Sequence, residues 1–392
     1  MENNMKFFII TIILSLFPAN LVLGQAGNLD ISRFGGKPNT DIAKAIVSAF
    51  TQACAATTPS KIVIPAGKYI MGSVDVKGPC KAPIELQVDG TISAPTDATT
   101  LKGVEYWFKI SHVNSFTLSG VGVFDGLGPS AWKQNDCTKN KDCKMLCMNF
   151  GFHFLNDSTI RDVTSKDSKN FHVNVLECGN VTFDGFKIIA PAESPNTDGI
   201  HIGRSNGVKI LNTNIGTGDD CISIGDGTSN VVVQNVNCGP GHGISVGSLG
   251  RYENEEPVEG LLVKNCTLKN TDNGVRIKTW PSDLGATVTD MNFEDITMIN
   301  VSNPIIVDQE YCPWNQCTKE KPSKIKISKV SFKNIKGTSG TKEGMSLICS
   351  KGVPCEEVQI ADVDLTFNGA ETSAKCANVK PIITGKAPVC AA

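Results

Sequence analysis

Short runs of alternating apolar and polar residues recur along the chain, each bounded by Asn, Asp or Gly. NSFTLSG, NVTFDG, GVKILN, NVVVQN, GLLVKN and DMNFED return at roughly 22 to 30 residues through the middle and later chain. Period-two alternation between turn residues is typical of short β-strands. A strand unit that recurs at this interval and cannot bury its apolar side alone predicts a stacked solenoid.

The repeat favours one class of solenoid. Leucine-rich repeats need a regular leucine pattern and propeller blades need a longer period, and neither is present. We therefore predict an all-β fold, a single-stranded right-handed parallel β-helix whose inward Ile, Val and Leu side chains stack into a core. Helical periodicity is clearest in DIAKAIVSAFTQAC, residues 41–54, with Asp41 placed to cap a helix. This short helix is expected to cover the N-terminal end of the stack.

The first 24 residues are predicted to be a secretory signal peptide. Lys6 precedes an apolar run, residues 7–16, and small residues lead to a cleavage point before Gln25. No other stretch approaches the roughly 18 apolar residues of a membrane span. Because composition does not change along the remainder, residues 25–392 are predicted to form one β-helix domain. We expect a secreted, extracellular monomer that is not held at a membrane.

If the protein is exported, its 15 cysteines are expected to form disulfides, because disulfides persist in an oxidising compartment. An odd total leaves at least one unpaired. The group Cys137, Cys143 and Cys147 is interpreted as a disulfide-tied loop, since no histidine follows at the spacing of a zinc site. Proximity in the sequence predicts the pairs Cys221 with Cys238, Cys349 with Cys355 and Cys376 with Cys390.

Charge and glycosylation signals fit the same class of protein. The formal net charge of -2 argues against a general polyanion-binding surface, and no nucleic-acid partner is expected. Acidic ligands would have to be recognised by a few placed cations. Sequons at four positions permit surface glycosylation: Asn156, Asn180, Asn265 and Asn300.

Acidic residues occupy one offset of the repeat. The apolar pairs that begin at Ile200, Ile222 and Ile244 follow one another in steps of 22 residues. If they take the same inward place on successive coils, residues two places earlier form a column with neighbours about 4.8 Å apart. Those residues are Asp198, Asp220 and His242, and Asp219 stands beside Asp220.

The next coil adds positive charge. In NGVRIKTW, Val275 and Ile277 take the inward places, so alternation sends Arg276 and Lys278 outward together. An Asp-Asp pair in a Gly-rich turn is often only a turn former or part of a calcium loop, and a single histidine is ambiguous. Stacked carboxylates repel one another, however, and a fold without a use for them would avoid that cost. The column therefore favours a functional site.

Hydrolysis of a glycosidic bond requires one protonated carboxyl group and one ionised carboxylate. Clustered acids supply both states, because repulsion separates their titrations. The neighbouring cations suit a substrate that carries carboxylates of its own. Together these features predict cleavage of a polyuronide.

The segments NTDGIHI, GTGDDCISIG, GPGHGISVG and NGVRIKTW resemble, in this order, the four signature segments of the polygalacturonases, glycoside hydrolase family twenty-eight. GHGISVGSLGRYENEEPVEG and DQEYCPWNQC look most like plant pollen-type exopolygalacturonases. The resemblance implies a pectin-lyase-like solenoid and an inverting hydrolase that cleaves α-1,4-galacturonosyl bonds of polygalacturonate in the cell wall. It also implies exo action, with galacturonate released from the non-reducing end. It implies no metal and no organic cofactor.

The resemblance also implies roles for eight residues. Asp219 would be the general acid, Asp198 and Asp220 would hold and deprotonate the attacking water, and His242 would tune the acid. Arg276, Lys278, Tyr311 and Asn196 would bind the substrate.

Three alternatives stay open at this point: endo action, a pectate lyase that cleaves by elimination, and a non-catalytic wall-binding β-helix. Exo action needs a groove closed at one side, and SLGRYENEEPVEG and the loop at residues 137–147 are candidate walls. Inversion predicts acid and base carboxyls roughly 6.5 to 9.5 Å apart, against about 5 Å for retention.

Overall fold

The computed structural model describes residues 27–137, 140, 142–313, 317 and 321–390. The predicted signal peptide, residues 1–24, lies outside the described residues. The assignment of residues 25–392 to one domain stays a prediction. Among the described residues, no helix is long and apolar enough to cross a membrane.

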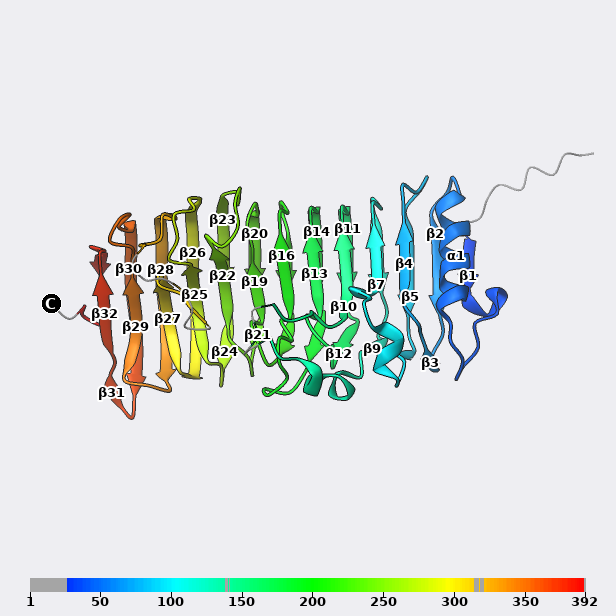
Figure 1. The fold of residues 1–392 in the computed structure, drawn as a ribbon, viewed down its shortest axis with the longest axis horizontal. Helices are drawn as coiled ribbons and strands as arrows, with labels where there is room; N and C mark the ends of the chain where they lie inside the picture. The colour runs from blue at the N-terminus through cyan, green and yellow to red at the C-terminus, as the bar shows by residue number, and fades with distance from the viewer. Residues whose placement is uncertain (1–26, 138–139, 141, 314–316, 318–320, 391–392) are drawn as a thin grey trace, which may run out of the picture.

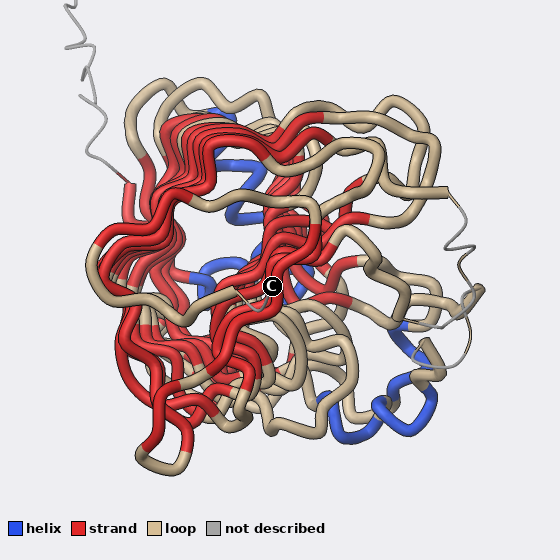
Figure 2. Tube along the Cα trace, turned by 90° about the vertical axis from the view of Figure 1, so that its left-hand side faces the viewer, coloured by secondary structure: helices blue, strands red, loops and turns tan. Residues whose placement is uncertain are grey.

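The chain winds into a stack of coils that run in order from the N-terminal helix to the C-terminal strands (Figure 1). Viewed along the stack, the strands of successive coils superpose into continuous walls (Figure 2). The smaller of the two sheets has 11 parallel strands. In spatial order they are β4 (Val74–Lys77), β7 (Tyr106–Ser111), β10 (Met148–His153), β13 (Val173–Leu176), β16 (Ile200–Gly203), β19 (Ile222–Ile224), β22 (Ile244–Leu249), β25 (Asn273–Thr279), β27 (Asn303–Asp308), β29 (Glu343–Ile348) and β32 (Ser373–Ala377).

The larger sheet has 22 strands in two parallel ladders that meet at one long strand, β26 (Thr287–Val301). The first ladder contains β1 (Gly27–Asp30), β2 (Ser60–Ile64), β5 (Ile84–Val88), β8 (Phe116–Ser119), β11 (Asn156–Arg161), β14 (Gly179–Asp184), β17 (Lys209–Leu211), β20 (Ser229–Gln234), β23 (Val258–Lys264), β26, β28 (Lys326–Ser339), β30 (Glu356–Phe367) and β33 (Ile382–Thr384). The second contains β3 (Lys68–Ile70), β6 (Thr91–Ser93), β9 (Val123–Asp125), β12 (Thr164–Lys166), β15 (Lys187–Ile189), β18 (Asn214–Gly216), β21 (Asn237–Cys238) and β24 (Thr267–Lys269), and β31 (Ala370–Glu371) lies antiparallel to β30.

This architecture confirms the predicted right-handed parallel β-helix. The register in the smaller sheet is the one that the 22-residue steps predict. Ile200 lies opposite Ile222, and Ile222 lies opposite Ile244, which in turn lies opposite Val275. All four side chains are fully buried. One turn of the chain therefore advances the sheet by one strand, and residues at one offset of the repeat lie side by side.

The predicted capping helix is α1 (Ala43–Ala55), two residues later at its start than expected. Its apolar side buries Ile46, Ala49 and Phe50 against the first coils. Asp41 is not the N-cap residue, but its Oδ1 accepts hydrogen bonds from the backbone N–H groups of Ala43 at 2.9 Å and Gly72 at 3.1 Å. Asp41 thus ties the helix to the strand end beneath it. The short 3-10 helices are η1 (Ile31–Phe34), η2 (Ala98–Leu101), η3 (Gly128–Ser130) and η4 (Trp132–Gln134).

Asn residues bound the strands because the turns between coils use left-handed backbone. Asn212, Asn235 and Asn265 occupy one corner of successive coils, with φ of 52°, 57° and 52°. Asn tolerates this conformation better than most residues. The side-chain amides form a ladder, from Asn265 to Asn235 at 2.7 Å and from Asn235 to Asn212 at 3.0 Å. The four sequon asparagines are all exposed.

Six disulfides tie the coils and loops. The three pairs predicted from proximity form, and Cys137 pairs with Cys143 within the expected loop. Two further pairs were not predicted, Cys54 with Cys80 and Cys312 with Cys317. Cys147, Cys178 and Cys266 are buried thiols, which accounts for the odd total.

Packing inside the coils predicts where the fold is sensitive to substitution. Ile202 on β16 is fully buried, whereas Ile189 on β15 is 51% exposed. We expect Ile202→Ala to lower the free energy of unfolding by about 2–5 kcal/mol, because it leaves a cavity. Ile189→Ala removes the same atoms from the surface and should change it by less than about 0.5 kcal/mol. Urea denaturation measures both, and equal losses would contradict the inward register.

Candidate active site

The smaller sheet places the predicted column at the start of three neighbouring strands. Asp198 precedes β16, Asp219 and Asp220 precede β19, and His242 precedes β22. On β25, Arg276 lies opposite Ser245 and Lys278 lies opposite Gly247, as the alternation predicts. A cleft of about 590 Å³ is lined by residues from these coils, among them Asn196, Asp198, Asp220 and Lys278.

Asp220 is the centre of the charge network. Its carboxylate is 1% exposed and accepts hydrogen bonds from Arg276 Nη2 at 2.8 Å and Lys278 Nζ at 2.7 Å. Ser245 Oγ donates a further hydrogen bond at 2.8 Å. Burial alone would raise the pKa of Asp220, but the charges of Lys278 and Arg276 outweigh it and lower the pKa to about 2. This carboxylate therefore remains an anion across the ordinary pH range.

Asp198 has the opposite character. It is 7% exposed, and its Oδ2 accepts a hydrogen bond of 3.3 Å from Ser223 Oγ. Burial, and then the negative charges of Asp219 and Asp220, raise the pKa of Asp198 well above its ordinary value. Two acids on neighbouring coils thus titrate far apart, chiefly because one carboxyl is buried and the other is paired with two cations, with repulsion between carboxylates as a further cause for Asp198.

Asp219 is the most accessible of the three acids, with a side chain that is 22% exposed. Its Oδ1 lies 3.0 Å from His242 Nδ1 and accepts the backbone N–H of Asp220 at 2.8 Å. Its Oδ2 accepts Nδ2 of Asn196 at 3.4 Å. The Oδ1 of Asn196 is buried and has no hydrogen-bond partner among the described residues. Asn196 therefore presents an unused acceptor beside Asp219.

His242 lies between two carboxylates. Nε2 is 3.4 Å from Oδ2 of Asp272, on the side opposite Asp219. Burial lowers the pKa of His242, but the hydrogen bond to Asp219 and the nearby negative charges outweigh this and raise it. Asp272 was not predicted from the sequence, although its position in the repeat matches that of Asp219. Asp272 precedes the inward Val275 by three residues, just as Asp219 precedes Ile222.

Tyr311 lies beside the cations. Its ring centroid is 5.4 Å from Lys278 Nζ and 6.0 Å from the Arg276 guanidinium carbon, and Trp280 packs edge-on at 5.5 Å. The structure thus brings all eight predicted residues together. Ser223 and Ser245 belong to the same network and were not predicted to be functional.

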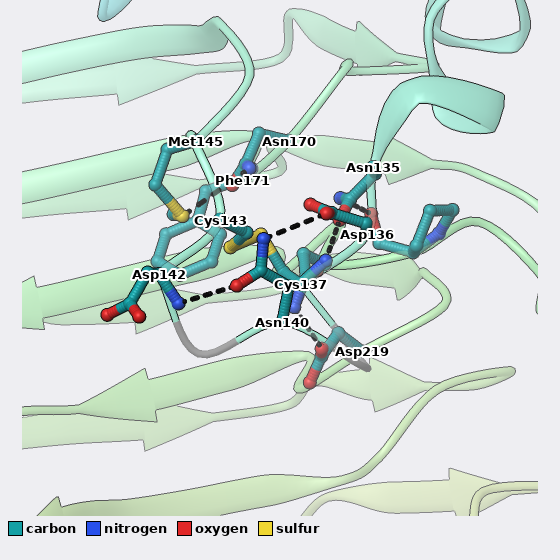
Figure 3. The surroundings of a disulfide bond; sticks show 12 residues. Asn135, Asp136, Cys137, Asn140, Asp142, Cys143, Met145, Asn170, Phe171 and Asp219 are labelled. Carbon is teal, nitrogen blue, oxygen red and sulfur yellow. Dashed lines mark hydrogen bonds between the residues drawn. A yellow bond between two sulfur atoms is a disulfide. The ribbon is translucent and has the colours of Figure 1, made fainter. Parts of the chain in front are cut away.

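Both predicted wall segments border the cleft. One part of the lining consists of Cys137, Cys143 and Met145. The disulfide between Cys137 and Cys143 lies close to Asp219 in Figure 3. This loop is held at its base by Asn135, whose Nδ2 donates to the carbonyl of Pro195 at 3.4 Å.

The opposite wall includes Arg251 and Tyr252. The Glu255 carboxylate accepts the backbone N–H groups of Gly250, Arg251 and Tyr252, which fixes the turn. Tyr252 remains 63% exposed at the rim. The cleft is thus bordered by two loops that are tied down by covalent or hydrogen bonds.

One carboxylate oxygen of Asp219, one of Asp220 and one ring nitrogen of His242 lie within 4.8 Å of one another. The same three groups could hold a metal ion by donor type and spacing. A divalent cation there would lie beside Arg276 and Lys278, whose charges already neutralise Asp220, so the electrostatics disfavour it.

Comparisons with known proteins agree with this architecture. Residues 54–390 match the sequence family described as glycosyl hydrolases family 28. A polygalacturonase of Medicago sativa is 63% identical, over 99% of this chain and 93% of that protein. An exopolygalacturonase of Oenothera organensis is 54% identical, over 88% of this chain and 96% of that protein.

Solved structures show the same fold. An exopolygalacturonase from Thermotoga maritima superposes with a TM-score of 0.76 at 19% identity, covering 92% of this chain and 91% of that one. An endo-xylogalacturonan hydrolase from Aspergillus tubingensis gives 0.80 at 24% identity, covering 91% and 98%.

The two buried acids predict opposite effects on stability. The Asp220 pKa lies below its ordinary value of 3.8, so its contribution to stability is present above about pH 4 and is lost as the pH falls through 2. Asp220→Asn should lower the free energy of unfolding at pH 7 by about 3–5 kcal/mol, because Arg276 and Lys278 lose their buried partner.

The pKa of Asp198 is raised in the native protein. The free energy of unfolding therefore falls as the pH rises through this raised pKa, because the buried carboxyl then ionises. Asp198→Asn should therefore stabilise the protein at pH 7, and the gain should disappear in acid. Urea denaturation of both variants at several pH values measures this. Destabilisation by both at pH 7 would contradict the assigned charge states.

Proposed function

The chain belongs to the glycosyl hydrolases of family 28, and on this premise we propose that it hydrolyses α-1,4-galacturonosyl bonds of polygalacturonate, releasing galacturonate from the non-reducing end. The observation that carries the proposal is the joint placement of three acids and two cations in one network beside the cleft, where both cations bind Asp220 and where Asp198, Asp220 and Lys278 line the cleft. Relatives named polygalacturonase and exopolygalacturonase support the substrate class and exo action.

Asp219 is proposed as the general acid. It is the acid with the most exposed side chain of the three, so it can reach the oxygen of the leaving sugar. Its hydrogen bonds with His242 and the backbone fix its orientation. Proton transfer from a positioned carboxyl group to the glycosidic oxygen allows the C–O bond to break.

Asp198 and Asp220 are proposed to hold the attacking water. Asp220 stays ionised because two cations neutralise it, so it can accept a hydrogen bond from water without taking the proton. Asp198, with its raised pKa, is the stronger base and takes that proton as the oxygen attacks the anomeric carbon. The water hydroxyl remains on the sugar, so one proton leaves Asp219 and one arrives at Asp198.

Arg276 and Lys278 are proposed to bind the galacturonate carboxylate. Both already contact Asp220, so an incoming carboxylate would share their charges with it. Arg276 presents a planar fork and Lys278 a point charge. Tyr311 would border the same subsite, and Asn196, which lines the cleft, would contact the substrate there.

Exo action requires that one end of the groove be closed. The Cys137 loop and the turn fixed by Glu255 border the cleft, and both are held by bonds rather than left free.

Six disulfides support an oxidising compartment, and we propose that the protein acts as a monomer outside the cell, on cell-wall pectin.

Replacement of the acid provides the first test of the reaction. Asp219→Asn should lower kcat on polygalacturonate by roughly 10²- to 10⁴-fold, because the amide cannot donate the proton, while binding of oligogalacturonate changes little. Asp364→Asn is the matched control, since it removes a carboxylate from an exposed pair with Lys386 on the larger sheet. Reducing-sugar release measures turnover, and wild-type-like activity of the Asp219 variant would refute the assignment.

Early products separate exo hydrolysis from its rivals. We expect monogalacturonate as the only early product, without ultraviolet absorbance. A ladder of oligomers would refute exo action and leave hydrolysis in place. An unsaturated, ultraviolet-absorbing product would indicate elimination by a lyase, and no product at all would favour a binding role.

A further inference from the structure

His242 is bracketed by carboxylates from the coils before and after it. Nδ1 faces Asp219 at 3.0 Å, and Nε2 faces Asp272 at 3.4 Å. The backbone N–H of His242 also donates to the Asp219 carbonyl at 2.7 Å. The imidazole therefore has one defined orientation, with each ring nitrogen directed at an acid.

Asp272 combines an exposed carboxylate with a fixed backbone. Its side chain is 74% exposed, whereas that of Asp219 is 22% exposed. Its N–H donates to the Gly241 carbonyl at 2.9 Å, and its carbonyl accepts the backbone N–H and Nδ2 of Asn303 at 3.0 and 2.9 Å. Both adjacent coils thus hold Asp272 in place, so its carboxylate stays next to His242 although it faces solvent.

The inference rests on the proposed function, because one step of that catalytic cycle requires an arrangement of this kind. After Asp219 donates its proton to the leaving oxygen, it must be protonated again before the next turnover. We propose that Asp272 is a positioning residue for this step: it holds the His242 imidazole against Asp219 and connects that imidazole to solvent. Asp272 does not contact the bond that breaks.

The proton transfers balance along the path from solvent through Asp272 and His242 to Asp219. Nδ1–H of protonated His242 gives its proton to the Asp219 carboxylate, which leaves a neutral imidazole. Nε2 then takes a proton that reaches it from solvent by way of Asp272. The charged groups that face His242 are Asp219, Asp220 and Asp272, which favour the imidazolium, and Arg276, which opposes it. Removing the Asp272 charge should therefore lower the pH at which His242 loses its proton.

Asp272→Asn tests the role of the charge, because its amide oxygen still accepts from Nε2–H. We expect kcat to fall by roughly two- to fivefold, as for an exposed ion pair, with KM unchanged. The alkaline limb of the kcat profile should move down by roughly half a pH unit, and Asp272→Glu should restore it. The control is Asp290→Asn, an exposed acid on β26 of the larger sheet, which should leave both quantities unchanged.

Titration of His242 by NMR gives a readout that does not depend on turnover. Its pKa should fall in the Asp272→Asn variant and stay unchanged in the Asp290→Asn variant. An unchanged His242 pKa, or an unshifted alkaline limb in an enzyme that hydrolyses polygalacturonate, would overturn the role of Asp272. Absence of hydrolysis by the wild-type protein would instead refute the proposed function, and the NMR titration would still decide whether Asp272 controls the charge of His242.

Discussion

Parallel hydrogen bonding between successive coils is the constraint on which the site depends. Each coil adds one strand to the smaller sheet, and neighbouring strands lie about 4.8 Å apart. Residues 22 positions apart in the sequence, such as Asp198 and Asp220, are therefore placed just before adjacent strands by the backbone alone. A slip of one residue would turn every outward side chain inward, so the buried isoleucines that fix the register also fix the positions of the candidate site residues.

Within that frame, charge pairing separates three chemically identical acids. Asp220 is neutralised by Arg276 and Lys278, both supplied by one strand two coils further along. Asp198 has no cation in direct contact among the described residues, and its buried carboxyl holds a proton more tightly. Asp219 has the most exposed side chain of the three and lies against His242 Nδ1. The environment of each carboxyl thus gives it a different task, and the substrate's own carboxylate would meet cations that are already ordered.

Much of this could be predicted from the sequence, because a repeat converts spacing into position. The steps between Ile200, Ile222 and Ile244 predicted the register, and alternation predicted the outward directions of Arg276 and Lys278. Tyr311 was identified only through resemblance, because it follows β27 in a segment that has no counterpart in the preceding coils. Asp272 was not predicted because it lies three residues before the inward Val275, at the offset of Asp219. The predicted column consists of residues two places before the inward residue.

The features that spacing could not predict lie outside the repeat. Cys54 ends the capping helix region and Cys80 lies in a loop, so their pairing depends on how the helix packs on the first coil. The same holds for the two loops that border the cleft, whose positions are set by a disulfide and by the carboxylate of Glu255. Proton NMR of freshly released galacturonate can show whether the water held by Asp198 and Asp220 attacks the face opposite the leaving group, as proposed. The β anomer should then appear first and mutarotate, whereas first appearance of the α anomer would refute inversion.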